Sequence, residues 1–327
     1  MVKTSSPPAY DFVHKRAMEY NWCMCMFFSV DLSGATAYKA SIREYHPFEL
    51  RDTIWSEAFS KFYTEFPKKF FERYVVAKTK AYDDYGLHQP VTWKYIGDEI
   101  LFYSSVLCQR HLVDHIKRFH ETLIEYNNDY LEKHDQFLRC KGTSWLVGFP
   151  VNNRIILIHE NVGEKQQPLP RIDFLGPSVD TGFRLTKFAS PQKLALSFEL
   201  AWMLADYYSS NPSDNDSGWM RFYFDGKYEL KGVNNSRPYP VFWLDMEYKK
   251  KSNGKESLAD FEDTWLQREH KTHCDPNDVV KYCEKFQGNE LAIIRPFISG
   301  DINGNFNRIP DDFDARRKII QKFYTTK

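Results

Sequence analysis

The hydrophobic pattern of the chain is clearest at Trp22–Asp31 (WCMCMFFSVD), which is apolar at nearly every position until its acidic end. Such an uninterrupted run predicts a strand that is buried on both faces, in the middle of a sheet. Because side chains alternate along a strand, Cys23 and Cys25 point to one side of it. We interpret them as small core residues and not as a redox pair. The sequence therefore predicts a central strand that ends at the carboxylate of Asp31.

A second strong pattern predicts a β-hairpin. Thr92–Ile96 and Glu99–Val106 are β-rich runs that are separated only by Gly97 and Asp98. Two residues that include a glycine, placed between two strand patterns, indicate a tight hairpin turn. Asp98 therefore lies at the tip of a predicted hairpin.

The remaining patterns mix helices and strands irregularly. The chain is expected to have a loose start, and then a helical region from Gly34 to about Val75 with a break at His46-Pro47. After the hairpin we expect a helix over Cys108–His134, a strand over Phe137–Phe149, and a ribbon and loop over Asn152–Pro170. The elements expected after that are a strand over Ile172–Leu175, a helix over Gly176–Ala189, a strand over Lys193–Leu200, a helix to about Tyr207, and strands over Trp219–Phe224, Tyr228–Val233 and Pro240–Met246. This mixture, with at least one hairpin, predicts an α+β fold and not a doubly wound parallel sheet.

Composition divides the chain into four segments. They are an N-terminal lead over 1–19, one large domain over 20–247, a linker over 248–257 and a C-terminal extension over 258–327. The linker (YKKKSNGKES) holds a run of lysines, which we interpret as a solvated tether in preference to a binding patch. The sequence of the extension indicates no role.

Charge and composition narrow the class of protein. The 327 residues include 44 basic and 44 acidic ones, a net charge of zero that argues against a nucleic-acid-binding surface. Twenty-six Phe, 20 Tyr and 8 Trp supply a large core and exclude general disorder. The longest apolar run is far shorter than the roughly 20 residues that span a bilayer. With six Cys and no signal-peptide pattern at the start, we expect a cytoplasmic protein without a membrane partner.

The candidate chemistry begins with the two carboxylates at the strand end and the hairpin tip. Taken singly, Asp31 is accounted for as a helix cap and Asp98 as a turn residue. Together, carboxylates from two adjacent segments can share divalent cations such as Mg²⁺ or Mn²⁺, which prefer oxygen ligands. Two such ions a few ångströms apart can hold a reacting phosphate.

Two other groups of residues are less promising as metal sites. His111 and His115 share a helix face without an evident third ligand, so we interpret them as surface or hydrogen-bonded histidines. Four residues lie close together in REHKTHCDPNDVVKYC, but their spacing fits a tetrahedral zinc site poorly; they are His270, His273, Cys274 and Cys283.

Four motifs that follow one another along the chain resemble a known family. They are VDLSGAT around Asp31, KYIGDEILFY around Asp98, IDFLGPSVDTGFRLTKFASP from Ile172 and LKGVNNSRPYPVFWL from Leu230. Their order and spacing resemble those of the class III nucleotidyl cyclases, over about residues 20–247. The resemblance implies a cyclase catalytic domain with a ferredoxin-like βαββαβ core, followed here by a small mixed C-terminal extension.

The resemblance also implies a reaction. The ribose 3′-oxygen of a nucleoside triphosphate attacks the α-phosphate and pyrophosphate leaves, with two divalent cations, Mn²⁺ or Mg²⁺, as cofactors. The two active sites of a head-to-tail homodimer are composite. The implied roles are metal binding by Asp31, Asp98 and the backbone carbonyl of Leu32, catalysis by Arg184 and Asp180, and nucleotide binding by Lys94, Asp173 and Lys231.

This chain departs from the family pattern at three positions. Asp180 stands where the family usually has Asn, and Ala35 replaces a bulky aromatic residue. Val233 stands where many members have a phosphate-binding Lys, a role for which Lys231 or Arg237 is a substitute. The departures motivate a second hypothesis, a catalytically dead cyclase fold that acts as a binding module. We expect a live enzyme because the metal pair and Arg184 are retained.

The base is left open by hydrogen-bond chemistry. A Lys94 donor and an Asp173 acceptor can satisfy adenine, cytosine or uracil, so ATP, CTP and UTP all remain. A diguanylate cyclase is disfavoured, since the single Gly97 and the segment around Arg184 belong to the class III pattern.

In overall character the chain resembles the pyrimidine cyclases of bacterial anti-phage signalling (Pycsar), because no receptor, sensor or membrane module accompanies the cyclase region. This resemblance implies cyclic UMP or cyclic CMP as a second messenger and a separate effector that the cyclase need not contact. We therefore expect UTP, or CTP, as the substrate, with an ATP-using adenylate cyclase as the alternative.

Overall fold

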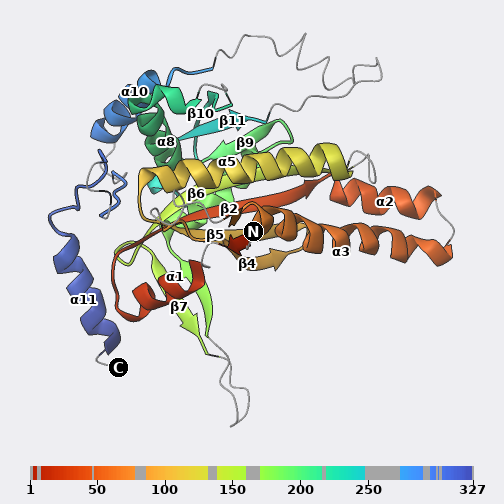
Figure 1. Ribbon diagram of the computed structural model, residues 1–327, viewed down its shortest axis with the longest axis horizontal. Helices are drawn as coiled ribbons and strands as arrows, with labels where there is room; N and C mark the ends of the chain where they lie inside the picture. Colours follow the sequence, from red (N-terminus) through yellow and green to blue (C-terminus); the bar gives the residue numbers. More distant parts are fainter. Residues whose placement is uncertain are drawn as a thin grey trace.

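A computed structural model describes residues 3–5, 9–45, 48–77, 86–131, 138–159, 170–215, 219–246, 273–289, 295–299, 301 and 304–325. Its centre is a seven-stranded sheet with the strand order β10-β11-β9-β6-β2-β5-β4 (Figure 1). The strands are β2 (Cys23–Ser33), β4 (Val91–Ile96), β5 (Glu99–Val106), β6 (Arg139–Phe149), β9 (Lys193–Leu196), β10 (Phe222–Tyr228) and β11 (Tyr239–Asp245). Two ribbons pair β1 (Lys3–Ser5) with β3 (Val75–Ala77) and β7 (Arg154–Ile158) with β8 (Arg171–Leu175).

The predicted central strand is confirmed. β2 lies between β5 and β6 and is antiparallel to both. Every residue from Cys23 to Val30 is buried, and Asp31 is the first that is partly exposed. The apolar run therefore occupies the middle of the sheet, and its acidic end is where the strand leaves the core.

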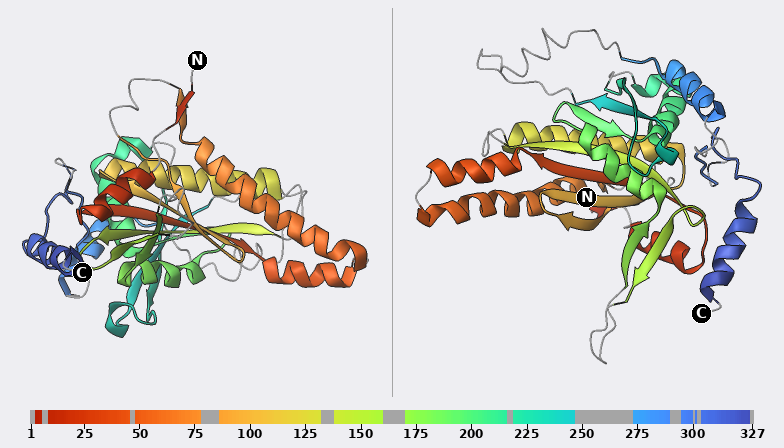
Figure 2. Two further views of the ribbon diagram at one scale, coloured as in Figure 1. Left: turned by 90° about the horizontal axis from the view of Figure 1, so that it is seen from below. Right: turned by 180° about the vertical axis from the view of Figure 1, so that it is seen from behind.

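The helices are α1 (Ala9–Met18), α2 (Ala35–Tyr45), α3 (Phe48–Glu72), α5 (Gln109–Glu125), α7 (Pro177–Leu185), α8 (Phe198–Ser210), α10 (Pro276–Asn289) and α11 (Phe313–Thr325). A π-helical turn over Tyr126–Leu131 extends α5. α2 and the adjoining part of α3 project beyond the sheet in all three views (Figures 1 and 2). The predicted break in this helical region is confirmed, since α2 ends at Tyr45 and α3 begins at Phe48.

Six elements of the central sheet and its helices have a ferredoxin-like topology. In chain order β2, α3, β4, β5, α5 and β6 form a βαββαβ unit, and its strands lie side by side in the order β6-β2-β5-β4. The neighbours within this unit are all antiparallel, whereas β6 and β9 pair in parallel. The predicted α+β class and the βαββαβ core are therefore confirmed.

Separate hydrophobic cores cover the two faces of the sheet. The larger core takes the even-numbered residues of β2 and is covered by α3, α5 and α8. The smaller core takes Cys23, Cys25 and Phe27 and is covered by residues of α1, β8 and α7. The Sγ atoms of the two cysteines lie 3.6 Å apart and are fully buried. Their interpretation as core residues is thus confirmed.

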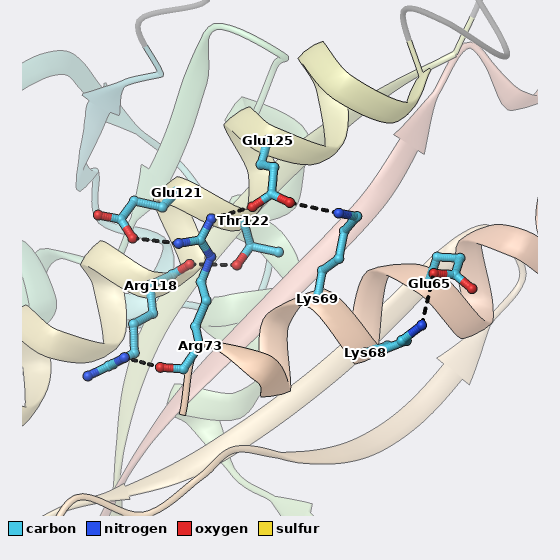
Figure 3. Close-up of polar contacts among 8 residues, drawn as sticks. All are labelled: Glu65, Lys68, Lys69, Arg73, Arg118, Glu121, Thr122 and Glu125. Carbon is cyan, nitrogen blue, oxygen red and sulfur yellow. Dashed lines mark hydrogen bonds and ion pairs between the residues drawn. The ribbon is translucent and has the colours of Figure 1, made fainter. Parts of the chain in front are cut away.

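Ion pairs join the end of α3 to α5 (Figure 3). Arg73 contacts Glu121 at 2.8 Å and Glu125 at 2.6 Å, and Lys69 contacts Glu125 at 2.7 Å. Arg118 of α5 also donates to the backbone carbonyl of Arg73. Because the two cations are only about one-quarter exposed, these pairs hold the two helices together better than fully exposed pairs would.

The two ends of the chain contribute to the cores. The expected loose start is wrong, because α1 forms there and buries Ala9 and Val13 completely in the smaller core. α10 packs against α8, and Cys283 and Phe306 belong to the larger core. The predicted linker, 248–257, lies outside the described residues, and the division into segments stays a prediction.

Two strand boundaries differ from expectation. The strand predicted over Lys193–Leu200 ends at Leu196, because Ser197 caps α8 by accepting a hydrogen bond from the Leu200 N–H at 3.2 Å. The strands predicted over Trp219–Phe224 and Tyr228–Val233 are replaced by the single strand β10.

None of the described helices has both the length and the apolar character that crossing a bilayer requires.

We expect Gly182→Ala to lower the free energy of unfolding by about 1–3 kcal/mol. Gly182 packs on the indole of Trp145, and an added Cβ would lie 2.0 Å from Cε2 of that ring. Urea denaturation measures the change. Gly288→Ala in α10 is the matched control, since no atom lies within 4 Å of its added Cβ. The control should raise stability by up to about 1 kcal/mol through helix propensity, and an equal gain at Gly182 would contradict the packing.

Candidate functional site

The strand end and the hairpin turn meet directly. The turn is Gly97-Asp98, with Gly97 in the left-handed region at φ 62°. The Leu32 N–H donates to the backbone carbonyl of Asp98 at 3.1 Å. This bond fixes the segment that carries Asp31 beside the segment that carries Asp98, as the sequence predicted.

Charged residues flank Asp31 on both neighbouring strands. Lys141 of β6 and Glu99 of β5 are its direct cross-strand partners. Lys141 Nζ lies 2.9 Å from Asp31 Oδ2, and about one-quarter of each side chain is exposed. The ammonium group therefore balances the strand-end carboxylate at the margin of the core.

Glu99 adds a third carboxyl to this region. Ser29, two residues before Asp31, donates a hydrogen bond to Glu99 Oε1. Burial raises the pKa of the Glu99 carboxyl, and the nearby charges of Asp31 and Asp98 raise it further.

A tyrosine of α3 holds the hairpin turn in place. The Tyr63 hydroxyl donates to the backbone carbonyl of Gly97, and its ring meets that of Tyr95 edge-on at 5.2 Å. Burial and then the charge of Asp98 raise the pKa of Tyr63. The turn is therefore held by both β2 and α3.

The two predicted base-reading residues are in contact. Lys94 Nζ lies 2.7 Å from Asp173 Oδ1, although Lys94 belongs to β4 of the central sheet and Asp173 to β8 of a separate ribbon. The same oxygen accepts from the indole N–H of Trp93 at 3.0 Å and from the backbone N–H of Phe174 at 2.9 Å. Lys94 Nζ also lies 4.6 Å from the centre of the Trp93 ring. The pair is thus held in a defined geometry.

The catalytic residues implied by the third motif lie on α7. Asp180 and Arg184 are four residues apart, so they share one helix face, and both are exposed. Within the described part of the chain, no hydrogen bond or ion pair joins either side chain to Asp31, Asp98 or Glu99. One chain therefore does not bring all the expected catalytic residues into contact.

The fourth motif forms the connection between β10 and β11. Lys231 is exposed and is followed by Gly232 at φ 78°. Val233, which stands at the family's usual phosphate-binding Lys, is 6% exposed and belongs to the larger core. Lys231 is therefore the exposed cation of this turn nearest to that position, and Arg237 is exposed a few residues later.

The alternative metal sites gain no support. His270 lies outside the described residues, and in the part described no group of three or more His, Cys, Asp or Glu is arranged to hold a metal ion. His111 and His115 are both fully buried, so the surface alternative is wrong. His115 Nδ1 and the Tyr74 hydroxyl form a hydrogen bond at 2.7 Å. These histidines belong to the packing of α5.

The strand end offers the oxygen donors that a hard divalent cation prefers, but Asp31, Asp98 and Glu99 do not form a three-carboxylate group arranged to hold a metal ion. The available groups are the carboxylates of Asp31 and Asp98 and the carbonyl of Leu32, all of which are oxygen donors. Asp31 already binds one cation, the Lys141 ammonium, at 2.9 Å. Sequence reasoning missed the contributions of Lys141, Glu99 and Trp93, because strand register brings them to the site.

Comparison with known proteins gives structural similarity only. Neither a protein-family model nor a curated protein matches the sequence. The chain is similar to the adenylyl cyclase CyaB from P. aeruginosa at 14% identity and a TM-score of 0.44, over 68% of this chain and 94% of that one. It is also similar to the guanylate cyclase domain of RhGC from Catenaria anguillulae, solved in complex with GTP, at 12% identity and a TM-score of 0.41. This similarity covers 68% of this chain and 96% of that one. These similarities assign neither a substrate nor an activity.

We expect the Lys94–Asp173 pair to show a coupling free energy of about 0.5–1 kcal/mol, because Trp93 and the Phe174 N–H hold Asp173 in place. A double-mutant cycle with Lys94→Met and Asp173→Asn, followed by urea denaturation, measures it. The Lys281–Asp278 pair, 75% and 72% exposed, is the matched control and should give a coupling near zero. Equal coupling in the two cycles would contradict a fixed pair.

Proposed function

We propose that this protein is a metal-dependent nucleotidyl cyclase of the cytoplasm. Its substrate is a pyrimidine nucleoside triphosphate, UTP in preference to CTP, and its products are the 3′,5′-cyclic nucleotide and pyrophosphate. The observation that carries this proposal is the 3.1 Å bond from Leu32 to Asp98, which sets the carboxylate-bearing ends of two sequence motifs side by side. Two metal-binding carboxylates on adjacent segments are what such chemistry requires.

The chain's own residues have distinct tasks in this reaction. The bond between the ribose 3′-oxygen and the α-phosphorus forms as the bond from that phosphorus to the pyrophosphate oxygen breaks, and the 3′-hydroxyl proton is released to solvent. Asp31, Asp98 and the Leu32 carbonyl would hold two divalent cations, Mn²⁺ or Mg²⁺, which would supply Lewis-acid activation and charge neutralisation. Arg184 stabilises the charge that develops on the α-phosphate, and Lys231 binds the phosphates. Asp180 accepts a hydrogen bond from the ribose.

The contacts of Asp173 leave one carboxylate oxygen for a pyrimidine base. Its Oδ1 already accepts from Lys94, Trp93 and the Phe174 N–H, so Oδ2 is the atom left to accept from a base. Uracil offers an N–H for Oδ2 and an adjacent carbonyl for the Lys94 ammonium. Cytosine fits the same two groups, so CTP is the second pyrimidine substrate to test.

The position of α7 supports a homodimer with composite active sites. Arg184 and Asp180 are exposed and share one helix face. Within the described residues they make no polar contact with the Asp31–Asp98 region. A second copy, packed head to tail, supplies its own α7 to the metal site of the first.

The biological role of the product rests on the sequence resemblance to anti-phage pyrimidine cyclases. In this proposal the cyclic nucleotide is a second messenger in anti-phage defence. A separate effector, which does not contact the cyclase, detects it.

Two observations favour other candidates. Lys94 and Asp173 can also pair with adenine, which makes an adenylate cyclase acting on ATP the first alternative. The burial of Val233 at the usual phosphate-binding position favours the second, a catalytically dead cyclase fold that binds nucleotide. The exposed Lys231, two residues earlier, supports the live enzyme.

We expect the purified protein with Mn²⁺ to release pyrophosphate and form a cyclic product from UTP, and from CTP more slowly. Asp31→Asn and Asp98→Asn should each lower kcat by at least about 100-fold, because each removes a metal ligand. The matched control is Asp278→Asn, which changes an exposed carboxylate of α10. Chromatography of the products from all four ribonucleotides decides: preference for ATP selects the first alternative, and no turnover of any of them selects the binding module.

Complementation tests the composite site. Asp31→Asn and Arg184→Gln should each be inactive as homodimers, because each lacks one part of both sites. Co-refolded at equal amounts, half of the dimers are mixed, and each mixed dimer has one complete site, so about one-quarter of the wild-type activity should return. No recovery in a sample that light scattering shows to be dimeric would contradict the shared site.

A further inference from the structure

A pocket of about 490 Å³ lies away from the carboxylate site. Its walls come from the end of β6, the start of α7, the β10–β11 connection and the C-terminal segment 295–316. It touches β2 at Met24, whereas Asp31 lies about 23 Å further along the strand, at roughly 3.3 Å per residue. The pocket is therefore distinct from the proposed metal site.

The size and lining of the pocket are typical of small-molecule sites. Such sites usually enclose about 300–1,000 Å³ and combine apolar walls with a few polar groups. The apolar part of the lining includes Met24, Leu146, Phe149, Phe297 and Phe313. Aromatic rings thus come from both the sheet and the C-terminal segment.

Two arginines of the C-terminal segment supply positive charge. The guanidinium of Arg295 lies 5.0 Å from the centre of the Trp202 ring and 4.9 Å from that of Phe306, so the rings hold it flat. Arg316 donates to Asn152 Oδ1 at 2.7 Å and lies 3.6 Å from the Asp312 carboxylate. Both arginines line the pocket, so an anionic group bound in it would meet positive charge.

The nearby carboxyl groups repel such an anion only weakly. Glu199 accepts a hydrogen bond from the Tyr239 hydroxyl at 2.9 Å, and burial raises the pKa of this carboxyl. A raised pKa favours the neutral acid, which repels an anion less. Asp312 is exposed, and its charge is balanced by Arg316.

We propose that this pocket binds a small molecule with a flat apolar body and one anionic group. The body lies among the apolar side chains, and the anion meets Arg316. The ligand contacts the sheet and the C-terminal segment together, so it joins them. Because α7 and the β10–β11 connection carry Arg184 and Lys231, occupancy also bears on catalysis; that consequence rests on the proposed function, whereas the binding does not.

Gly148 offers a way to fill the pocket without disturbing the sheet. It lines the pocket, and an added Cβ would meet only Met24 Cε, at 3.9 Å. Gly148→Val therefore places a branched side chain, well suited to a strand, in the space that the ligand needs. Gly148→Ala, with a much smaller side chain, is the matched control.

The experiment titrates the full-length protein with 1-anilinonaphthalene-8-sulfonate, a dye with an aromatic body, one N–H group and one sulfonate, and follows its fluorescence. We expect one saturable site per chain. Gly148→Val and Arg316→Gln should each weaken binding by at least about tenfold, through lost space and a lost charge-assisted contact. Gly148→Ala should stay within about twofold, and so should Arg308→Gln, which changes an arginine that is 83% exposed outside the pocket.

Several results would overturn the proposal. One is the absence of a saturable site in the wild type, and another is unchanged binding in both Gly148→Val and Arg316→Gln. A third is loss of binding in Phe323→Ser alone, which would place the dye on the exposed apolar face of α11, where Phe323 is 58% exposed. Urea denaturation checks that each variant is folded, and if Gly148→Val is not, Arg316→Gln decides. Turnover plays no part in this test, so its failure is distinguishable from failure of the proposed enzyme.

Discussion

The structure depends on the complete burial of β2. An apolar strand needs partners for its backbone groups on both edges and cover on both faces. β5 and β6 provide the backbone partners, and the two hydrophobic cores cover the two faces. The βαββαβ topology places α3 and α5 over one face, while α1, β8 and α7 cover the other. Burial ends at Asp31, so the constraint that builds the fold also sets a carboxylate at the margin of the core.

The candidate site is organised by individually placed charges. Asp31 is held by Lys141 and Asp173 by Lys94, each through a partly buried pair with an N–O distance below 3 Å. The chain has equal numbers of acidic and basic residues, which suits a site for one nucleotide better than a broad anionic partner. In the proposed enzyme the remaining positive charge comes from Arg184, Lys231 and the bound cations. The pocket beside Met24 contains different cations, Arg295 and Arg316, which come from the C-terminal segment.

Sequence patterns predicted elements well where one local signal dominated. The Gly97-Asp98 turn and the apolar run before Asp31 each have one physical interpretation, and both are confirmed. The prediction of one strand over Lys193–Leu200 was wrong at its C-terminal half. A short run that is rich in apolar residues fits a strand or a buried helix equally well until the cap at Ser197 is known. α1 was missed because its helical pattern is short and its burial depends on β5 and β7, which come much later in the chain.

The sequence by itself determined the α+β class, the central strand, the hairpin and the position of Asp31 and Asp98 at the ends of these elements. These follow from local rules on periodicity and turns, which need no knowledge of distant residues. Only the tertiary structure decided that Lys141 pairs with Asp31, that Trp93 and Lys94 meet Asp173, and that Val233 is buried beside a second pocket. Each of these contacts depends on strand register and on packing between segments far apart in the chain, and the free energy that fixes them is shared among many residues.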